Sequence, residues 1–219
     1  LYTNGVAKGT ITNANTLGYN NPSFSRCGGG VNGVSRYISN YRIIRGTAID
    51  FASTGVPSSP VSTSTTNQSL LTAYANRFTD SNTATTAKSV TPSNNAKVVP
   101  FSPFPQTTAY TPSVVNQGSV KFDGSGDGLS TSVGTSFNVG SGDFTIESFG
   151  YLTTTGQFSN ILSAGTDASN GYRLDISTGN NLRLLAYIGG SWNTVITGST
   201  ALTTGKWYHL AVTRNGNDF

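Results

Sequence analysis

The sequence has few of the residues on which catalytic and metal sites depend. Its 219 residues include one Glu, one His and one Cys, and no Met. Charged residues make up 10% of the chain, against about a quarter in an average soluble domain. A single Cys excludes a disulfide within the chain, and one His far from one Cys does not fit the ligand spacing of zinc sites.

The charge pattern and the hydropathy of the sequence argue against two classes of partner, nucleic acids and membranes. The net charge of +4 reflects a shortage of acids, and the 13 Lys and Arg residues are scattered without a run. A nucleic-acid-binding protein concentrates its cations on a patch or stripe, so no nucleic-acid partner is expected. No apolar run approaches the roughly 18 residues of a membrane span.

The sequence begins without Met or a signal peptide, so we expect an upstream segment or a processing event.

The pattern of hydrophobic residues predicts an all-β fold. Short alternating segments are separated by Gly, Asn, Ser and Pro, which favours an antiparallel sandwich or jelly roll. Residues 70–78 suit either a short helix or a strand. The clearest expected strands are 1–6, 37–44, 118–122, 144–148, 161–162, 172–177, 182–188, 192–196 and 207–212.

Two segments lack this regularity. Residues 50–67 hold Pro57, Pro60 and many Ser and Thr, which is typical of a linker or an extended arm on the surface. Residues 92–112 hold five of the chain's eight prolines. Because Pro cannot donate to a strand ladder, we expect this segment at a sheet edge or as a wrapping loop.

The two ends of the sequence look like the two halves of one hairpin. The segment GKWYHLAVTRNGNDF (205–219) reads as a strand followed by a turn at Asn215-Gly216-Asn217, and LYTNGVAKGT (1–10) reads as the returning strand. We therefore expect either one window of a longer repeating chain or a permuted domain that closes on itself or on a neighbour.

Five segments in order resemble laminin-G-like domains of the concanavalin A-like lectin and glucanase superfamily. They are FDGSGDGL (122–129), GDFTIESFGYL (142–152), NGYRLDIS (170–177), NLRLLAYIGGSWNTV (181–195) and GKWYHLAVTRNGNDF (205–219). LYTNGV (1–6) and YISNYRIIRGTA (37–48) resemble the closing strands of such a domain. SLLTAYANRFTD (69–80) and VVPFSPF (98–104) resemble the opening segment of tandem copies, as in structural proteins of marine bacteriophages and bacterial surface proteins.

The resemblance implies a concanavalin A-like jelly-roll sandwich of two antiparallel sheets, in permuted order. Residues 1–48 are then the closing strands of a laminin-G-like domain. Residues 69–219 are the opening and central strands, and residues 49–68 are a Ser/Thr/Pro-rich linker.

No catalytic residue is predicted. The superfamily includes glucanases, which need two carboxylates at a fixed separation. Glu147 is the only glutamate, and no acid lies two residues away on its strand face. We expect it to be a sheet-face side chain with a local hydrogen-bond partner. His209, the only histidine, is expected in the core or on a sheet face, and the chain is predicted not to be an enzyme.

No cofactor and no metal ligand are predicted, and calcium is disfavoured. Many relatives bind Ca²⁺ through Asp and Asn oxygens on loops at one rim. Asp123 and Asp127 flank a Gly-rich turn, and Asp143 and Asp167 occupy other turns. These acids do not form a twelve-residue calcium loop, and Asp commonly forms turns through hydrogen bonds to its own backbone.

Cys27 has two interpretations. Free Cys is commonly a small buried apolar residue. An odd Cys in an extracellular protein also pairs between molecules.

A glycan site is the main binding hypothesis. Tyr187, Trp192 and Asn193 cluster around the Gly189-Gly190 turn, where an aromatic ring face can stack on a sugar beside an amide. The alternative is that Trp192 is buried against Leu185 or a neighbouring domain.

The sequence thus favours a structural and adhesive module or fibre subunit at a cell or virion surface. Its main partners are copies of itself, joined head to tail by strand complementation or in covalent tandem. The alternative function is a discrete lectin-like module for host or cell-surface polysaccharide. The residues expected at the joint between subunits are Leu1, Tyr2, Val6, Tyr37, Ile43, Leu210, Val212 and Phe219.

Overall fold

The computed structural model describes residues 1–12, 17, 35–75, 77–105, 118–131, 137–164 and 171–219. In these residues antiparallel strands dominate, and the one helix is the single turn α1 (Phe51–Thr54). The all-β prediction is confirmed. Cys27 and Asp167 lie outside the described residues.

The larger sheet combines strands from the whole length of the chain. In the described residues its order is β2-β1-β14-β9-β3-β7-β6, and β4 pairs with β3. Its strands are β1 (Tyr2–Thr3), β2 (Val6–Ala7), β3 (Arg36–Arg45), β4 (Gln68–Thr72), β6 (Lys97–Val99), β7 (Ser119–Phe122), β9 (Phe144–Leu152) and β14 (Trp207–Arg214). The segment 70–78, which suited a helix or a strand, begins inside β4.

The smaller sheet is a meander in chain order, β10-β11-β12-β13. Its strands are β10 (Ser159–Ala164), β11 (Tyr172–Ile176), β12 (Asn181–Ile188) and β13 (Ser191–Ala201), and a separate short pair joins β5 (Thr91–Ser93) to β8 (Gly128–Ser130). The expected turn at Gly189-Gly190 is confirmed, because Ile188 faces Ser191 across it. Both glycines have positive φ, 62° and 85°, as this type of two-residue turn requires.

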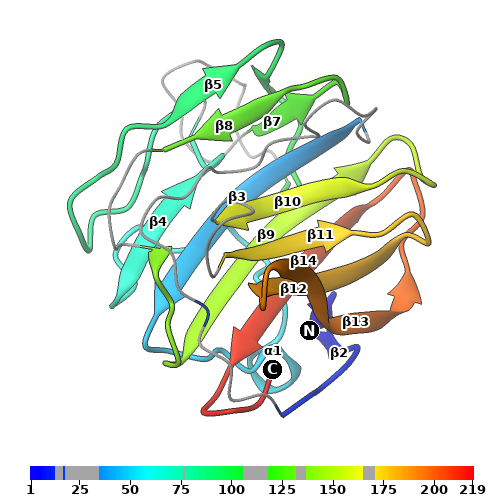
Figure 1. Ribbon diagram of the computed structural model, residues 1–219. Coiled ribbons are helices and arrows are strands. Elements are labelled where there is room, and N and C mark those ends of the chain that lie inside the picture. The colour runs from blue at the N-terminus through cyan, green and yellow to red at the C-terminus, as the bar shows by residue number, and fades with distance from the viewer. Residues whose placement is uncertain (13–16, 18–34, 76, 106–117, 132–136, 165–170) are drawn as a thin grey trace.

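The core lies between the two sheets, which Figure 1 shows face to face, with β10 to β12 in front of β3, β9 and β14. Because successive side chains of a strand point to opposite faces of the sheet, every second residue points into this layer. The inner face of β9 contributes Phe144 and Ile146, β14 contributes Leu210 and Val212, and the smaller sheet contributes Leu174 among others. Each fully buried side chain of this kind stabilises the fold by about 1.5–3 kcal/mol.

A β-bulge in β3 changes which residues face the core. Opposite β9, Ser39 pairs with Phe149 and the next pair is Arg42 with Glu147, so two residues of β3 lie opposite the single residue Ser148 of β9. Asn40 has a positive φ of 50°, a conformation that Asn tolerates better than most residues. As a result Ile38 and Tyr41, three positions apart, both reach the core, and Arg42 faces outward.

Residues 1–12 close one side of the sandwich. β1 pairs antiparallel with β14, with Tyr2 opposite Ala211 and Thr3 opposite Leu210. The backbones of Ile11 and Phe219 exchange two hydrogen bonds of 3.2 and 2.9 Å, and the N–H of Ser199 in β13 donates to the carbonyl of Lys8 at 2.8 Å. This segment therefore touches the edges of both sheets.

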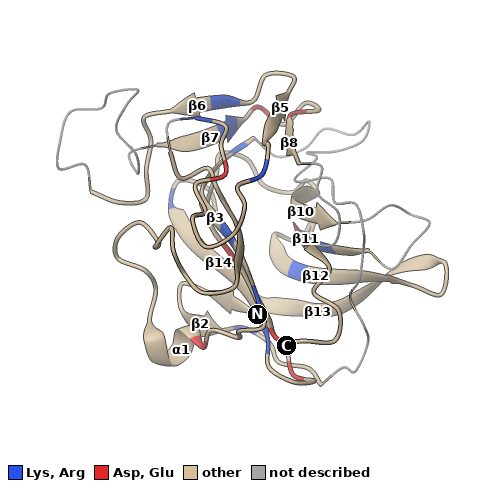
Figure 2. Cartoon of the chain, turned by 90° about the vertical axis from the view of Figure 1, so that its left-hand side faces the viewer, with Lys and Arg blue, Asp and Glu red and all other residues tan. Residues whose placement is uncertain are grey.

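The outer face of the larger sheet carries a third layer. Figure 2 shows α1 on the opposite side of that sheet from β10 to β13. Residues 49–68, expected as a linker or surface arm, cross this face with Phe51 and Val61 buried. The Pro-rich segment provides the edge strand β6 and then Phe101 and Phe104, whose rings pack on Tyr37 and Phe149 of the same face.

Candidate functional site

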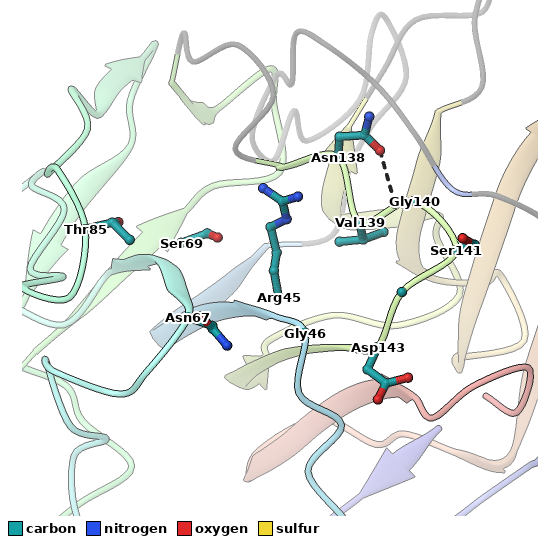
Figure 3. Close-up of a pocket in the computed structure, with 11 residues that line it drawn as sticks. Arg45, Gly46, Asn67, Ser69, Thr85, Asn138, Val139, Gly140, Ser141 and Asp143 are labelled. Atoms are coloured by element: carbon teal, nitrogen blue, oxygen red, sulfur yellow. Dashed lines mark hydrogen bonds between the residues drawn. The ribbon is translucent and has the colours of Figure 1, made fainter.

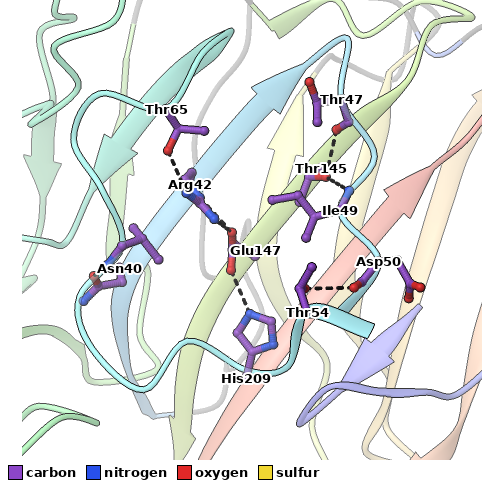
Figure 4. A network of polar contacts seen from close by, with 11 residues as sticks. Asn40, Arg42, Thr47, Ile49, Asp50, Thr54, Thr65, Thr145, Glu147 and His209 are labelled. Carbon is purple, nitrogen blue, oxygen red and sulfur yellow. Dashed lines mark hydrogen bonds and ion pairs between the residues drawn. The ribbon is translucent and has the colours of Figure 1, made fainter. Parts of the chain in front are cut away.

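Three polar side chains from adjacent strands meet on the covered outer face of the larger sheet. Glu147 of β9 lies between Arg42 of β3 and His209 of β14 (Figure 4). Arg42 Nε donates to Glu147 Oε1 at 2.7 Å, and His209 Nε2 lies 2.8 Å from Glu147 Oε2. Both carboxylate oxygens of Glu147 therefore have protein partners.

The third layer isolates this network from water. Glu147 and His209 are each 1% exposed and Arg42 is 7% exposed. Thr65 Oγ1 accepts from Arg42 Nη1 at 3.1 Å, and the ring of Phe51 lies 4.6 Å from the His209 ring. The segment 49–68 thus supplies both a polar and an aromatic contact to the network.

The environment favours the ionised form of Glu147. Burial alone raises the pKa of this carboxyl, but the hydrogen bond with His209 and the charge of Arg42 outweigh burial, and the pKa falls below its ordinary value of 4.5. A glycosidase general acid needs the opposite, a raised pKa and access to the sugar bond. The expectation of a sheet-face Glu and His with local hydrogen-bond partners is confirmed.

The lowered pKa predicts a loss of stability in acid. An ionised Glu147 stabilises the folded state fully above the unfolded pKa of about 4.5, and this contribution disappears as the pH falls through the lower folded pKa. We expect the free energy of unfolding, measured by urea denaturation, to fall below pH 4.5 more steeply in the parent than in Glu147→Gln. Parallel curves for the two proteins would contradict this assignment.

The residues of the glycan hypothesis lie at one end of the smaller sheet. Tyr187 and Trp192 face each other across β12 and β13, with ring centroids 5.5 Å apart, and both are partly exposed. Asn193 is paired with Ala186, one position along, and its Nδ2 donates to the carbonyls of Ile188 and Ser191, each at 3.0 Å. The structure brings the two rings together and directs the amide into the turn.

Charged residues extend this aromatic surface. Asp175 is buried and accepts from Arg183 Nε at 2.9 Å and from Arg173 Nε at 3.1 Å. The guanidinium of Arg173 lies over the rings of Phe158 and Trp192, at 4.7 and 4.8 Å from their centroids. Burial raises the pKa of Asp175 in spite of the opposing hydrogen bond from Arg183. From the sequence these charges were not placed on the surface, although Arg173 and Asp175 alternate with the apolar residues of 172–177; Arg183 comes from the neighbouring strand β12.

The acids of the 123–127 turn hold backbone groups. Asp127 accepts from the N–H of Asn95 at 2.7 Å and of Asp123 at 2.6 Å. Asp123 accepts from the N–H of Ser125 at 2.8 Å. Asp143 likewise accepts from the N–H of Gly216 at 2.7 Å. This is the arrangement of turn-forming Asp residues.

The residues expected to join subunits separate into buried and accessible groups. The core contains Leu1, Ile43, Leu210, Val212 and Phe219. The other three lie outside it. Tyr2 packs against Phe51 and donates its hydroxyl to Asp50 at 3.1 Å, and Tyr37 packs on Phe101 and Tyr151. Val6 is 54% exposed on the edge strand β2.

Comparison with known proteins identifies one domain. Residues 123–219 match a laminin G family model that is described as concanavalin A-like lectin/glucanases superfamily. No curated protein and no solved structure matches the chain. These residues are therefore similar to a laminin-G-like domain, and the antiparallel all-β sandwich is consistent with the expected concanavalin A-like architecture. Among the described helices, none has the length and apolar character of a membrane span.

Proposed function

We propose that this laminin-G-like chain is a non-enzymatic structural and adhesive module of an extracellular or virion-surface assembly, in which copies are joined through the pairing of β1 with β14. The observation that carries the proposal is this pairing itself. A strand of two residues, β1, covers the edge of the eight-residue strand β14. Such an edge is a template for the same segment of another copy.

The surface around β1 supports self-association. In the described residues, the large hydrophobic side chains that are exposed are Val6 and Ile11, at 54% and 38%. Both lie in the segment that borders β14. The outer edge of β2 has no neighbouring strand in the described part of the sheet. Exchange of this segment between copies joins modules head to tail, and a peptide bond between successive copies gives the same pairing in covalent tandem.

The environment of Glu147 is the reason for proposing a non-enzymatic module. Its two oxygens bind Arg42 and His209, its pKa is lowered, and residues 49–68 cover it. A carboxylate in this state is a poor proton donor for glycoside hydrolysis.

Self-association is tested by native mass spectrometry over a wide concentration range. We expect dimers and larger species that form on concentration and revert slowly, because exchange requires β1 to detach. A Tyr2→Pro substitution places a proline opposite Ala211 in the β1–β14 ladder and is expected to reduce these species, since proline disrupts strand pairing. A monomer at every concentration would overturn the strand-exchange form of the proposal.

Carbohydrate binding is the second candidate function, and the Tyr187–Trp192 pair favours it. Two partly exposed rings at a sheet end, beside charged and amide groups, are suited to sugar stacking. We expect Trp192→Ala to weaken polysaccharide binding about tenfold, as loss of a stacking contact of about 1–1.5 kcal/mol implies. Trp192→Phe keeps an aromatic face and serves as the matched control. Equal affinity of Trp192→Ala and the parent in isothermal titration calorimetry would remove this surface as the site.

A further inference from the structure

Residues 49–61 cross the outer face of the larger sheet as a strap that is fixed at both ends. At one end the N–H of Ile49 donates to Thr145 Oγ1 of β9 at 2.8 Å (Figure 4). At the other end the N–H of Val61 donates to Asn40 Oδ1 of β3 at 3.2 Å, and the Val61 side chain is buried. Both anchors belong to strands other than β1, so the strap does not depend on β1 for its attachment.

The middle of the strap packs on β1. The Phe51 ring contacts the Tyr2 ring, with centroids 5.6 Å apart, and the Tyr2 hydroxyl donates to Asp50 Oδ1 at 3.1 Å. Figure 2 shows the single turn α1 beside β2, the strand that follows β1. The Phe51 ring also contacts the ring of His209 in β14. One side chain of the strap, Phe51, therefore touches both strands of the β1–β14 pair.

The turn between β1 and β2 fits closely against the strap. Gly5 has a positive φ of 73°, and a Cβ atom at this position would lie 3.0 Å from Val56 Cγ2 and 3.3 Å from the Phe51 carbonyl oxygen. Asn4, the other residue of this turn, makes two hydrogen bonds of 2.8 Å with the backbone of His209. Its N–H donates to the His209 carbonyl, and its side-chain oxygen accepts from the His209 N–H. The turn is therefore held by both β14 and the strap.

Asp50 holds α1 and β1 with the same carboxylate oxygen. Its Oδ1 accepts from the N–H of Ala52 at 3.0 Å, as the side chain of a helix N-cap does, and also from the Tyr2 hydroxyl. The Asp50 carbonyl accepts from Thr54 Oγ1 at 2.8 Å (Figure 4). Asp50 is exposed, so its replacement changes these contacts without opening the core.

We propose that the strap acts as a latch, which keeps β1 on β14 and controls how readily β1 detaches for exchange between copies. Its role in exchange rests on the proposed function, whereas the latch itself is a property of a single chain. A β1 strand from another copy meets the same strap with the same contacts, because domain swapping exchanges identical elements. A weaker latch is therefore expected to speed exchange in both directions and to leave the fraction of exchanged dimer at equilibrium unchanged.

Hydrogen exchange of the full chain in dilute solution, followed by mass spectrometry, tests the latch without any assembly. Asp50→Ala removes the cap of α1 and the acceptor of the Tyr2 hydroxyl. We expect the amides of residues 2–8 to exchange about three- to tenfold faster in this variant than in the parent. Asp50→Asn keeps a side-chain oxygen for both contacts, so it is the matched control with the exchange of the parent.

The amides of β12 in the smaller sheet report on the rest of the fold and are expected to stay unchanged in Asp50→Ala. Equal hydrogen exchange of residues 2–8 in Asp50→Ala and the parent would overturn the proposal. An increase of the same size in β12 would also overturn it, because the substitution would then weaken the whole fold and not the hold on β1.

Mixing of isotopically light and heavy copies tests the role of the latch in assembly, with native mass spectrometry following the mixed dimers over time. We expect mixed dimers of Asp50→Ala to form about three- to tenfold faster than those of the parent and to reach the same final fraction. A changed final fraction with an unchanged rate would overturn the latch as a control of strand exchange. If no dimer forms in either protein, the strand-exchange function fails, and the hydrogen exchange of residues 2–8 still decides whether the strap holds β1.

Discussion

Replacing Glu147 with alanine is expected to lower the free energy of unfolding by about 3–5 kcal/mol, because it removes one partner of a buried ion pair. Arg42 then keeps a buried positive charge with Thr65 as its remaining partner in the network, and His209 loses the acceptor at its Nε2. Urea denaturation followed by circular dichroism measures the change. A loss of this size is a large part of the stability of an ordinary domain.

Two further variants separate the charge effect from general damage. Asp218→Asn removes an exposed carboxylate and is expected to change stability by less than about 1 kcal/mol. The double variant Glu147→Ala with Arg42→Ala removes both charges of the pair, so its cost is expected to be smaller than the sum of the two single costs. A cost below about 1 kcal/mol for Glu147→Ala alone would show that the pair does not hold the strands together.

Replacing Phe51 with alanine is expected to cost about 3–5 kcal/mol, the range for truncation of a buried Phe. Phe51 is 2% exposed and its ring packs on Tyr2 and His209. The substitution opens a cavity and also gives water access to the Glu147 network. Thermal unfolding measures the loss, and limited proteolysis is expected to cut residues 49–60 sooner than in the parent.

Ser58→Ala is the matched control for Phe51→Ala. Ser58 is exposed in the same segment, so a change within about 0.5 kcal/mol is expected. If Phe51→Ala has the same thermal unfolding and the same resistance to protease as the parent, residues 49–68 do not act as a packed layer.

Periodicity predicted most of the fold. The alternation in 172–177 and 207–212 places Leu174, Leu210 and Val212 in the core, as the structure confirms. The sequence indicated only part of the network around Glu147. Glu147 and His209 stood out because each is the single residue of its kind, but Arg42 did not. The bulge at Asn40 reverses the phase of β3, and a pattern of period two does not reveal such a shift.

Long-range packing explains what the sequence did not reveal. Residues 49–68 carry a linker composition, yet Phe51 and Val61 are buried because the outer face of the larger sheet offers an apolar and aromatic surface. A pocket at the rim of the sandwich is lined by four segments, near residues 45, 67, 85 and 140 (Figure 3). No local motif links these four segments, so the pocket becomes visible only once the register of β3, β4 and β9 is known.

Cross-linking of mixed variants tests the exchange of β1 between copies most directly. In a Cys27→Ser background, one copy carries Tyr2→Cys and a second copy with a size tag carries Ala211→Cys. These positions face each other in the sheet, so an oxidised pair bridges them. A mixture of Tyr2→Cys with Lys206→Cys, a position outside that register, is the control. Strand exchange predicts a disulfide-linked heterodimer in the first mixture alone. A bridge that forms only within one chain carrying both substitutions, with no heterodimer in the mixture, would contradict it.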